Sequence, residues 1–256
     1  MITHDIWEQV TTSSAWALNL VTVPKPDGRI RITTDFSPPN NFVVPEHHPL
    51  PRINNLYMQL QGPRMFTKLD LSKGYFHILL APESCPLTST IKPYDLFQYK
   101  RLPMGLMDAA SVFQPLVLQT LEGCEGCFSY LNNILVFSSM ATQLNGRVRA
   151  LLQCLSDKDF RLNVAKCQFA ITNVPFLRHL ISSTGIKPDP KSLDAIPNVR
   201  IPQSIIDIRS FLGSISWLHE FWPHLPDHAE PLQQLTVRLR KSSLNGVMNV
   251  QPHLTS

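Results

Sequence analysis

The feature of this sequence that most constrains its fold is a polar turn between two short apolar segments. Tyr130 to Asn133 follows Phe128-Ser129 and precedes the apolar run Ile134 to Phe137. Two apolar segments joined by a tight polar turn predict a β-hairpin. An earlier segment, Phe66 to Leu71, predicts a further strand that carries Asp70. If this strand lies beside the hairpin, positions 70, 132 and 133 meet at one point.

Clustered carboxylates at such a point are typical of phosphoryl transfer. Two Mg²⁺ ions about 3.5–4 Å apart act in that chemistry, and Mg²⁺ prefers carboxylate oxygens and water as ligands. Here only Asp70 is charged, because the other two positions hold Asn132 and Asn133. A structural interpretation is also open, since asparagine tolerates the left-handed backbone of tight hairpin turns. Asp70 taken alone could likewise cap a turn or pair with a lysine.

The composition is that of a globular protein. The chain has 256 residues, 43% of them hydrophobic, enough to bury a core of one or two folded units. Its formal net charge is +4, but only 16% of its residues are charged, so charge alone does not predict nucleic-acid binding. No apolar run approaches the roughly 20 residues of a membrane span, and Met1 to Asp5 does not resemble a signal peptide. We therefore expect an intracellular protein, cytoplasmic or nuclear, that is neither secreted nor in a membrane.

The five cysteines are an odd number, which favours reduced thiols over a disulfide framework. Cys124 and Cys127 have the spacing of a metal-binding pair. A structural zinc site normally needs four ligands, and no second pair stands nearby in the sequence. A loop between a helix and the hairpin is the favoured interpretation.

The first part of the chain predicts a hairpin, a loop and a helix. Strands are expected at Leu20–Val23 and Arg29–Thr34 around Asp27-Gly28, with isoleucines alternating against basic residues on the second strand. Proline-rich segments at 37–40 and 45–51 predict a connecting loop. An apolar stripe over residues 53–60 predicts a helix.

The second part predicts helices separated by strands. Leucine and valine at helical spacing predict a helix through residues 144–155, and strands are expected at 169–172 and 176–181. Four prolines between Lys187 and Pro202 predict a linker. Ser204 and Asp207 have the spacing of a capping box, which predicts a helix over 205–218. Residues 242–256 are rich in Ser, Asn and Gln without a period and predict a loose tail.

Several short segments occur in a fixed order along the chain. They are Trp16-Ala17, Lys25 to Gly28, Pro49 to Ile53, Phe66 to Tyr75, Leu102 to Leu106, Phe113-Gln114, Tyr130 to Ser138, Lys166 to Phe169, Phe176 to His179 and Arg209 to Gly213. In this order, over about residues 13–235, the sequence resembles the reverse transcriptase domain of gypsy-like long-terminal-repeat retrotransposons. The two missing acids make it resemble a degenerate copy.

The resemblance implies an α+β right-hand polymerase fold. It would have fingers at residues 1–45 and 78–108, and a palm with an antiparallel sheet at 46–77 and 109–186. A short helical thumb with the start of the connection would follow at 187–241. A palm helix is expected from Ala109 to Leu121, although Pro115 in its interior would cost about 3 kcal/mol or kink it.

The resemblance also implies RNA-directed DNA synthesis from dNTPs on an RNA or DNA primer–template with Mg²⁺ or Mn²⁺. Asp70, Asn132 and Asn133 would stand at the catalytic positions, and Asp70 with the Leu71 carbonyl would hold the metal. Each change from Asp to Asn removes one negative charge beside two dications. We therefore expect polymerisation to be abolished or nearly so. Two alternatives are a non-catalytic module that binds nucleic acid or a protein partner, and a translated relic that folds poorly.

Further roles are implied residue by residue. Lys25 and Arg31 would contact the triphosphate of the nucleotide, or simply lie on a solvated strand face. Tyr75 would exclude the 2′-hydroxyl of a ribonucleotide, or belong to the core. Gln114 and the Met104-Gly105 backbone would line the nucleotide and template side, and Leu71 would lie at the nucleotide. Lys166 would lie near the phosphates of the nucleotide, or on the free surface. Leu177, Arg178 and His179 would form the primer grip, with Arg178 in the place of a usual glycine.

Overall fold

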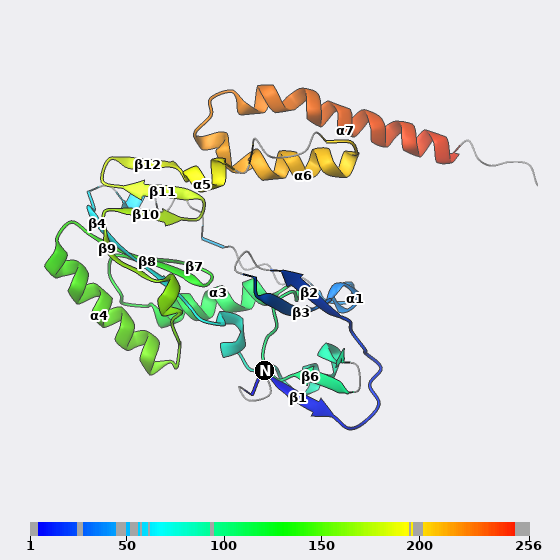
Figure 1. Ribbon diagram of the computed structural model, residues 1–256, viewed down its shortest axis with the longest axis horizontal. Helices are drawn as coiled ribbons and strands as arrows, with labels where there is room; N and C mark the ends of the chain where they lie inside the picture. The colour runs from blue at the N-terminus through cyan, green and yellow to red at the C-terminus, as the bar shows by residue number, and fades with distance from the viewer. Residues whose placement is uncertain are drawn as a thin grey trace, which may run out of the picture. The chain divides into compact units, whose positions relative to one another are not determined.

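The computed structural model describes residues 5–24, 28–44, 50–51, 56, 58–60, 62–92, 95–194, 196 and 202–248, with side chains described as far as Val237. The chain divides into two compact units, Met1–Val174 and Pro175–Ser256 (Figure 1). One or two units were expected from the length. The division falls earlier than the predicted start of the thumb at residue 187.

A four-stranded antiparallel sheet forms the centre of the first unit. Its strands are β4 (Met65–Asp70), β7 (Cys127–Tyr130), β8 (Asn133–Ser138) and β9 (Gln168–Ile171), in the order β7-β8-β4-β9. The predicted hairpin and the predicted strand therefore lie side by side. The β8 segment is buried from Ile134 to Ser138, as its continuous apolar run requires.

Two helices pack against this sheet. The helix α4 (Ala141–Asp157) buries Leu144, Val148, Leu151 and Leu155, the stripe that the sequence predicts. The helix α3 (Ala109–Thr120) buries Phe113 and Val117. It continues through Pro115, which removes one backbone N–H from the helical ladder. The buried face offsets that loss, so the helix stays one element over almost all of its predicted length.

The other strands of the first unit form two smaller sheets. One contains β1 (Trp7–Val10), β5 (Thr90–Ile91) and β6 (Leu96–Tyr99) in the order β1-β6-β5. The other is the predicted hairpin, observed as β2 (Leu20–Pro24) and β3 (Ile30–Thr34). Short helical segments complete the unit at α1 (Ser37–Asn40), η2 (Gly74–His77), η3 (Pro82–Thr88) and η4 (Val164–Lys166). Residues 56, 58 and 59 are helical, within the predicted 53–60 helix.

The second unit contains a three-stranded sheet and helices. The sheet runs β10 (Asn173–Phe176), β11 (His179–Ser182) and β12 (Gly185–Pro188), with β10 starting in the last residues of the first unit. The helical segments are α5 (Pro190–Leu193), α6 (Ile205–Ile215), η5 (Ser216–Glu220) and α7 (Leu225–Met248). The capping box is confirmed, because the Asp207 N–H donates to Ser204 Oγ at 3.1 Å.

Two predictions for this unit are wrong. The expected strand over 176–181 is interrupted by Leu177 and Arg178, whose φ values of 51° and 68° turn the chain into a hairpin. The expected loose tail from residue 242 is helical as far as Met248, because no proline interrupts α7 after Pro231 within this helix. Residues 249–256 lie outside the described residues. Within the described part of the chain, no helix is both long and apolar enough to cross a membrane.

Candidate functional site

Strand pairing brings the three predicted site positions together. Asp70 at the end of β4 lies opposite Asn133 at the start of β8, and Asn133 lies opposite Tyr130 at the end of β7. The Leu71 N–H donates to the Asn132 carbonyl oxygen at 2.7 Å. The expected meeting of positions 70, 132 and 133 is therefore confirmed as geometry.

The residue with a left-handed backbone in the tight hairpin turn is Leu131, and not one of the two asparagines. Leu131 has φ 49°, and neither Asn132 nor Asn133 has a positive φ. The structural interpretation of the asparagines as suppliers of a left-handed backbone is therefore wrong. A leucine in this conformation is strained by about 1 kcal/mol or more, so neighbouring contacts must hold it.

Gln114 supplies such a contact from helix α3. Its Oε1 accepts a hydrogen bond from the Leu131 N–H at 2.6 Å, and its Nε2 donates to Ser129 O at 3.2 Å and Ser129 Oγ at 3.3 Å. The Gln114 side chain is fully buried. Both polar atoms of this side chain are therefore engaged with the hairpin, and the expectation that the segment around Gln114 lines the nucleotide side stays a prediction. Gln114 holds the turn in place.

Replacing Gln114 should loosen that turn. The variant Gln114→Leu leaves the Leu131 N–H without its acceptor, and we expect a loss of about 1–3 kcal/mol in the free energy of unfolding. The measurement is the urea midpoint of the variant against the native chain. The control Gln119→Leu lies exposed on the same helix and should stay within about 0.5 kcal/mol. Equal effects of the two substitutions would contradict the role of Gln114.

The single carboxylate of the cluster is paired with a lysine. Lys166 Nζ lies 3.7 Å from Asp70 Oδ2, and the Asp70 side chain is 16% exposed while that of Lys166 is 64% exposed. The Asp70 carbonyl oxygen accepts a hydrogen bond from the Asn163 N–H at 2.8 Å. The segment that carries Lys166 is thus tied to β4 by the backbone. Lys166, expected near phosphates or on the free surface, lies beside Asp70.

Asn132 occupies a tight place beside the turn that follows β4. Its Oδ1 is buried and has no hydrogen-bond partner among the described residues. A methyl group at Gly74 would clash with this oxygen and would lie 2.7 Å from Phe113 Cζ. Only glycine fits at position 74. A buried oxygen without a hydrogen-bond partner costs free energy, so the surroundings of position 132 do not satisfy the amide that it carries.

The residues at this point do not fit a two-magnesium centre. They offer one carboxylate and two neutral amides, and the carboxylate already faces the Lys166 ammonium. Within the described ranges, no three or more His, Cys, Asp or Glu side chains are grouped to hold a metal ion. The Leu71 carbonyl adds no charge. The expected Mg²⁺ or Mn²⁺ therefore lacks the anionic ligands that two adjacent dications require.

Tyr75 lies between the core and the hairpin. Its ring centroid is 4.9 Å from that of Phe113. Burial is the main cause that raises the pKa of the Tyr75 hydroxyl, and the nearby Tyr130 raises it further. The side chain is only partly buried. Tyr75 thus packs against the core with one part and remains accessible with another, so both of its sequence interpretations stay open.

The remaining predicted residues lie away from this cluster or outside the description. Arg31 is exposed on β3, and Lys25 lies outside the described residues. In the second unit, Arg178 is exposed at the β10–β11 turn with Leu177 beside it. His179 is buried, its Nδ1 is 2.6 Å from Leu177 O, and its ring centroid is 5.2 Å from that of Phe221. The His179 side chain therefore belongs to the core of its own unit, and the primer grip expected at Leu177, Arg178 and His179 stays a prediction.

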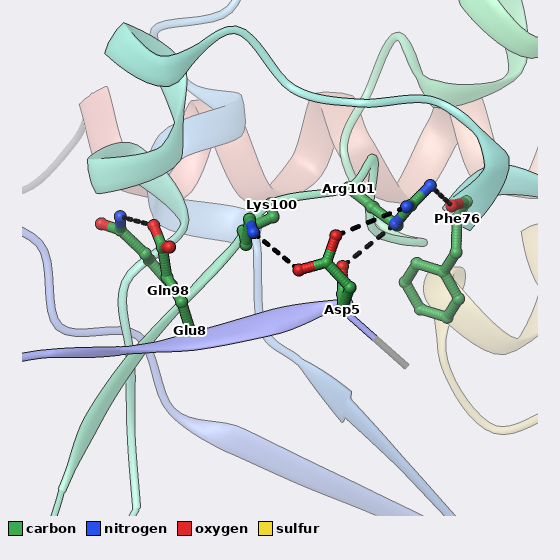
Figure 2. A network of polar contacts seen from close by, with 6 residues as sticks. All are labelled: Asp5, Glu8, Phe76, Gln98, Lys100 and Arg101. Carbon is green, nitrogen blue, oxygen red and sulfur yellow. Dashed lines mark hydrogen bonds and ion pairs between the residues drawn. The ribbon is translucent and has the colours of Figure 1, made fainter. Parts of the chain in front are cut away.

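A polar cavity in the first unit was missed by the sequence analysis. Its volume is about 730 Å³, and its lining includes four cationic residues, Lys73, Arg101, Lys158 and Arg161, with Asp159 as the one acid. Figure 2 shows how Arg101 is held: its Nε donates to Asp5 O at 3.0 Å and its Nη1 to Phe76 O at 3.2 Å. No single run of basic residues signals the cavity, because its cations come from three separate segments of the chain.

The arrangement defines a class of protein. An antiparallel sheet with an acid at the end of one strand, beside a hairpin turn, is the palm of a right-hand polymerase. The foamy viral protease–reverse transcriptase dRH in complex with ds DNA is similar, with a TM-score of 0.82 and 20% identity, covering 93% of this chain and 42% of that one. The same viral protein with an RNA/DNA hybrid gives a TM-score of 0.79, again at 20% identity, covering 93% of this chain and 32% of that one. The predicted fold class is confirmed.

The sequence then identifies the family. Residues 23–187 match the reverse transcriptase (RNA-dependent DNA polymerase) family, and the chain belongs to it. It is 32% identical over 217 residues to the retrovirus-related Pol polyprotein from transposon opus of Drosophila melanogaster, covering 83% of this chain and 22% of the relative. It is also 32% identical over 217 residues to the transposon Tf2-7 polyprotein of Schizosaccharomyces pombe, covering 83% of this chain and 16% of the relative. The chain thus spans about a fifth of the length of these curated relatives.

Proposed function

We propose that this chain is a reverse transcriptase domain from a gypsy-like retrotransposon Pol polyprotein that binds primer–template but no longer polymerises. The observation that carries the proposal is the pairing of Asp70 with Asn133 and its ion pair with Lys166. The positions that gather at the palm hold one negative charge instead of three. Restoring the two carboxylates tests whether their absence explains the loss of polymerisation. A binding measurement with a duplex tests whether the chain still binds primer–template.

The loss of two negative charges is large enough to decide whether the chain polymerises. One pair of unit charges at 4 Å is worth about 4 kcal/mol at an effective dielectric of 20. Each 1.36 kcal/mol in the barrier changes a rate about tenfold. Even partial loss of two such interactions therefore reduces the rate by several orders of magnitude. An amide oxygen can still coordinate a cation, but it does not supply the missing charge.

The proposed function assigns the nucleotide and primer contacts to particular residues and subdomains. We propose Asp70, Asn132 and Asn133 as the catalytic positions, supported by their pairing, and Leu71, Tyr75, Lys166 and the segment around Gln114 as nucleotide contacts. We propose Lys25 and Arg31 as triphosphate contacts of the fingers at 1–45 and 78–108. The palm is proposed at 46–77 and 109–186, the thumb at 187–241, and the primer grip at Leu177, Arg178 and His179.

Nucleic-acid binding is supported by charge at the polar cavity. The similar viral proteins were solved with ds DNA and with an RNA/DNA hybrid. In this chain, Lys73, Lys158 and Arg161 are exposed cations at the cavity, beside the turn that follows Asp70. Cations that contact phosphates release counterions from the duplex, so the affinity should fall as salt rises.

Reversing one of these charges should weaken binding and its salt dependence. We expect Arg161→Glu to lower the affinity for a primer–template duplex about tenfold or more, and to reduce the salt slope by about one. The measurement is fluorescence anisotropy over a series of salt concentrations. The matched control is Arg149→Glu, an equal charge change at an exposed position on α4. Equal losses in both variants would point to net charge alone, and absence of duplex binding in the native chain would favour a protein-binding module.

A further inference from the structure

Three cysteines gather at one corner of the first unit, away from the positions assigned above. Cys124 follows the end of α3, Cys127 begins β7, and Cys154 lies in the last turns of α4. The Cys124 S–H donates to Cys154 Sγ at 3.5 Å. The Cys127 S–H donates instead to the Cys124 carbonyl oxygen at 3.1 Å. All three side chains are partly exposed, so small molecules can reach them.

We propose that Cys124 and Cys154 form an oxidative modification site, at which a hydroperoxide converts the two thiols into an intramolecular disulfide. The two sulfur atoms already touch, and a bond of about 2.05 Å needs an approach of about 1.5 Å. Side-chain rotation supplies movement on that scale. Cys127 is the rival partner by sequence spacing, but its thiol is directed to a backbone oxygen.

The hydrogen bond between the thiols sets the order of reaction. Burial, the bond to Cys154 and the nearby sulfur of Cys154 raise the pKa of Cys124 to about 12, and burial raises the pKa of Cys127 to about 11. Cys124 therefore keeps its proton and donates a hydrogen bond to Cys154 Sγ. We assign the first nucleophile to Cys154, because its sulfur accepts this hydrogen bond while Cys124 remains in the less reactive thiol form.

The two steps balance as follows. Cys154 Sγ attacks the outer peroxide oxygen and the O–O bond breaks. One proton passes from the Cys154 thiol to the leaving oxygen, so the products are a sulfenic acid on Cys154 and one molecule of alcohol, or water from hydrogen peroxide. Cys124 Sγ then attacks the sulfenic sulfur, the S–O bond breaks, and the Cys124 proton leaves with the hydroxyl as water. Two thiols are oxidised by two electrons in total, and the peroxide is reduced.

The disulfide would close a loop that contains the site hairpin. Cys124 and Cys154 are 30 positions apart in sequence, and β7, the turn and β8 lie between them. The bond would tie the end of α4 to the corner after α3. Closing a loop of this length restricts the unfolded chain and raises the stability of the folded unit.

The test uses the full chain, reduced and then treated with hydrogen peroxide under native conditions. We expect loss of two hydrogens per chain, a Cys124–Cys154 peptide in a non-reducing digest, and a rise of about 5–10 °C in the unfolding temperature of the first unit that a dithiol reverses. The variant Cys85→Ser, Cys167→Ser should behave like the native chain. The variants Cys154→Ser and Cys124→Ala should each lose the cross-linked peptide and the rise in unfolding temperature.

Three outcomes would overturn the proposal. One is a Cys124–Cys127 disulfide in the native chain. Another is oxidation that yields only disulfides between chains or stops at single modified thiols. The third is the same yield of Cys124–Cys154 when the chain is oxidised in denaturant, since the folded geometry would then contribute nothing.

Discussion

A chain carrying Asn132→Asp and Asn133→Asp is expected to extend a primer in the presence of Mg²⁺ or Mn²⁺, while the native chain stays silent. The pairing of β4 with β8 puts position 133 opposite Asp70, so the double substitution would give the cluster three carboxylates. Each restored charge acts next to the reacting phosphates, and the gain should be several orders of magnitude. The measurement is incorporation of dNTPs on a poly-ribonucleotide template, after a folding check of both chains.

The matched control makes the same change from Asn to Asp at two other positions. Asn145→Asp and Asn173→Asp are exposed positions and alter net charge equally, so this control should remain silent. Activity in the native chain would refute the loss of chemistry. Silence in a well-folded revertant would shift the loss to other departures, and Arg178 at the proposed primer-grip turn would be the first position to change, to glycine.

The second large effect is expected from Phe113→Ala. The Phe113 ring is fully buried and contacts both Tyr75 and Phe160, with centroid distances of 4.9 Å and 6.4 Å. Removing it leaves a cavity among α3, α4 and the sheet, and we expect a loss of about 3–5 kcal/mol in the free energy of unfolding. Urea denaturation followed by tryptophan fluorescence and circular dichroism measures this loss.

The neighbouring substitution Val112→Ala provides the control on the same helix. Val112 is 41% exposed, so its truncation should change stability by only about 0.5 kcal/mol. Similar small effects of both variants would mean that α3 does not pack as described. A broad, non-cooperative transition in the native chain itself would support the poorly folding relic instead.

The elements that the sequence predicts well have local physical signals. The stripe of α4 follows helical periodicity, and the α6 start follows from the Ser204 side chain that caps it. The meeting of Asp70 and Asn133 follows from two strands and a turn. For the α4 stripe and the α6 cap, a few residues close in sequence carry the information, whereas the meeting of Asp70 and Asn133 needs the pairing of two strands that are distant in sequence.

The features that the sequence did not predict depend on distant partners. Leu131 and Leu177 adopt left-handed backbones although leucine does not favour them. Gln114 gives no sign in the sequence that it bonds to a hairpin 15 positions later. Cys154 sits on an ordinary helix, and only folding brings it to Cys124. Such contacts are set by tertiary packing and have no local pattern.

The ion pair of Asp70 with Lys166 has a consequence for the balance between stability and activity. Three carboxylates at one point repel one another unless cations stand between them, and an active site of that kind lowers the stability of its own fold. This chain holds one carboxylate with its own ammonium partner. If Asn132 and Asn133 stand at the proposed catalytic positions, a neutral pair replaces a self-repelling cluster there, and we expect the fold to be indifferent to chelators. In the function proposed above, the two asparagines would thus lower charge repulsion at the same positions where they lower activity.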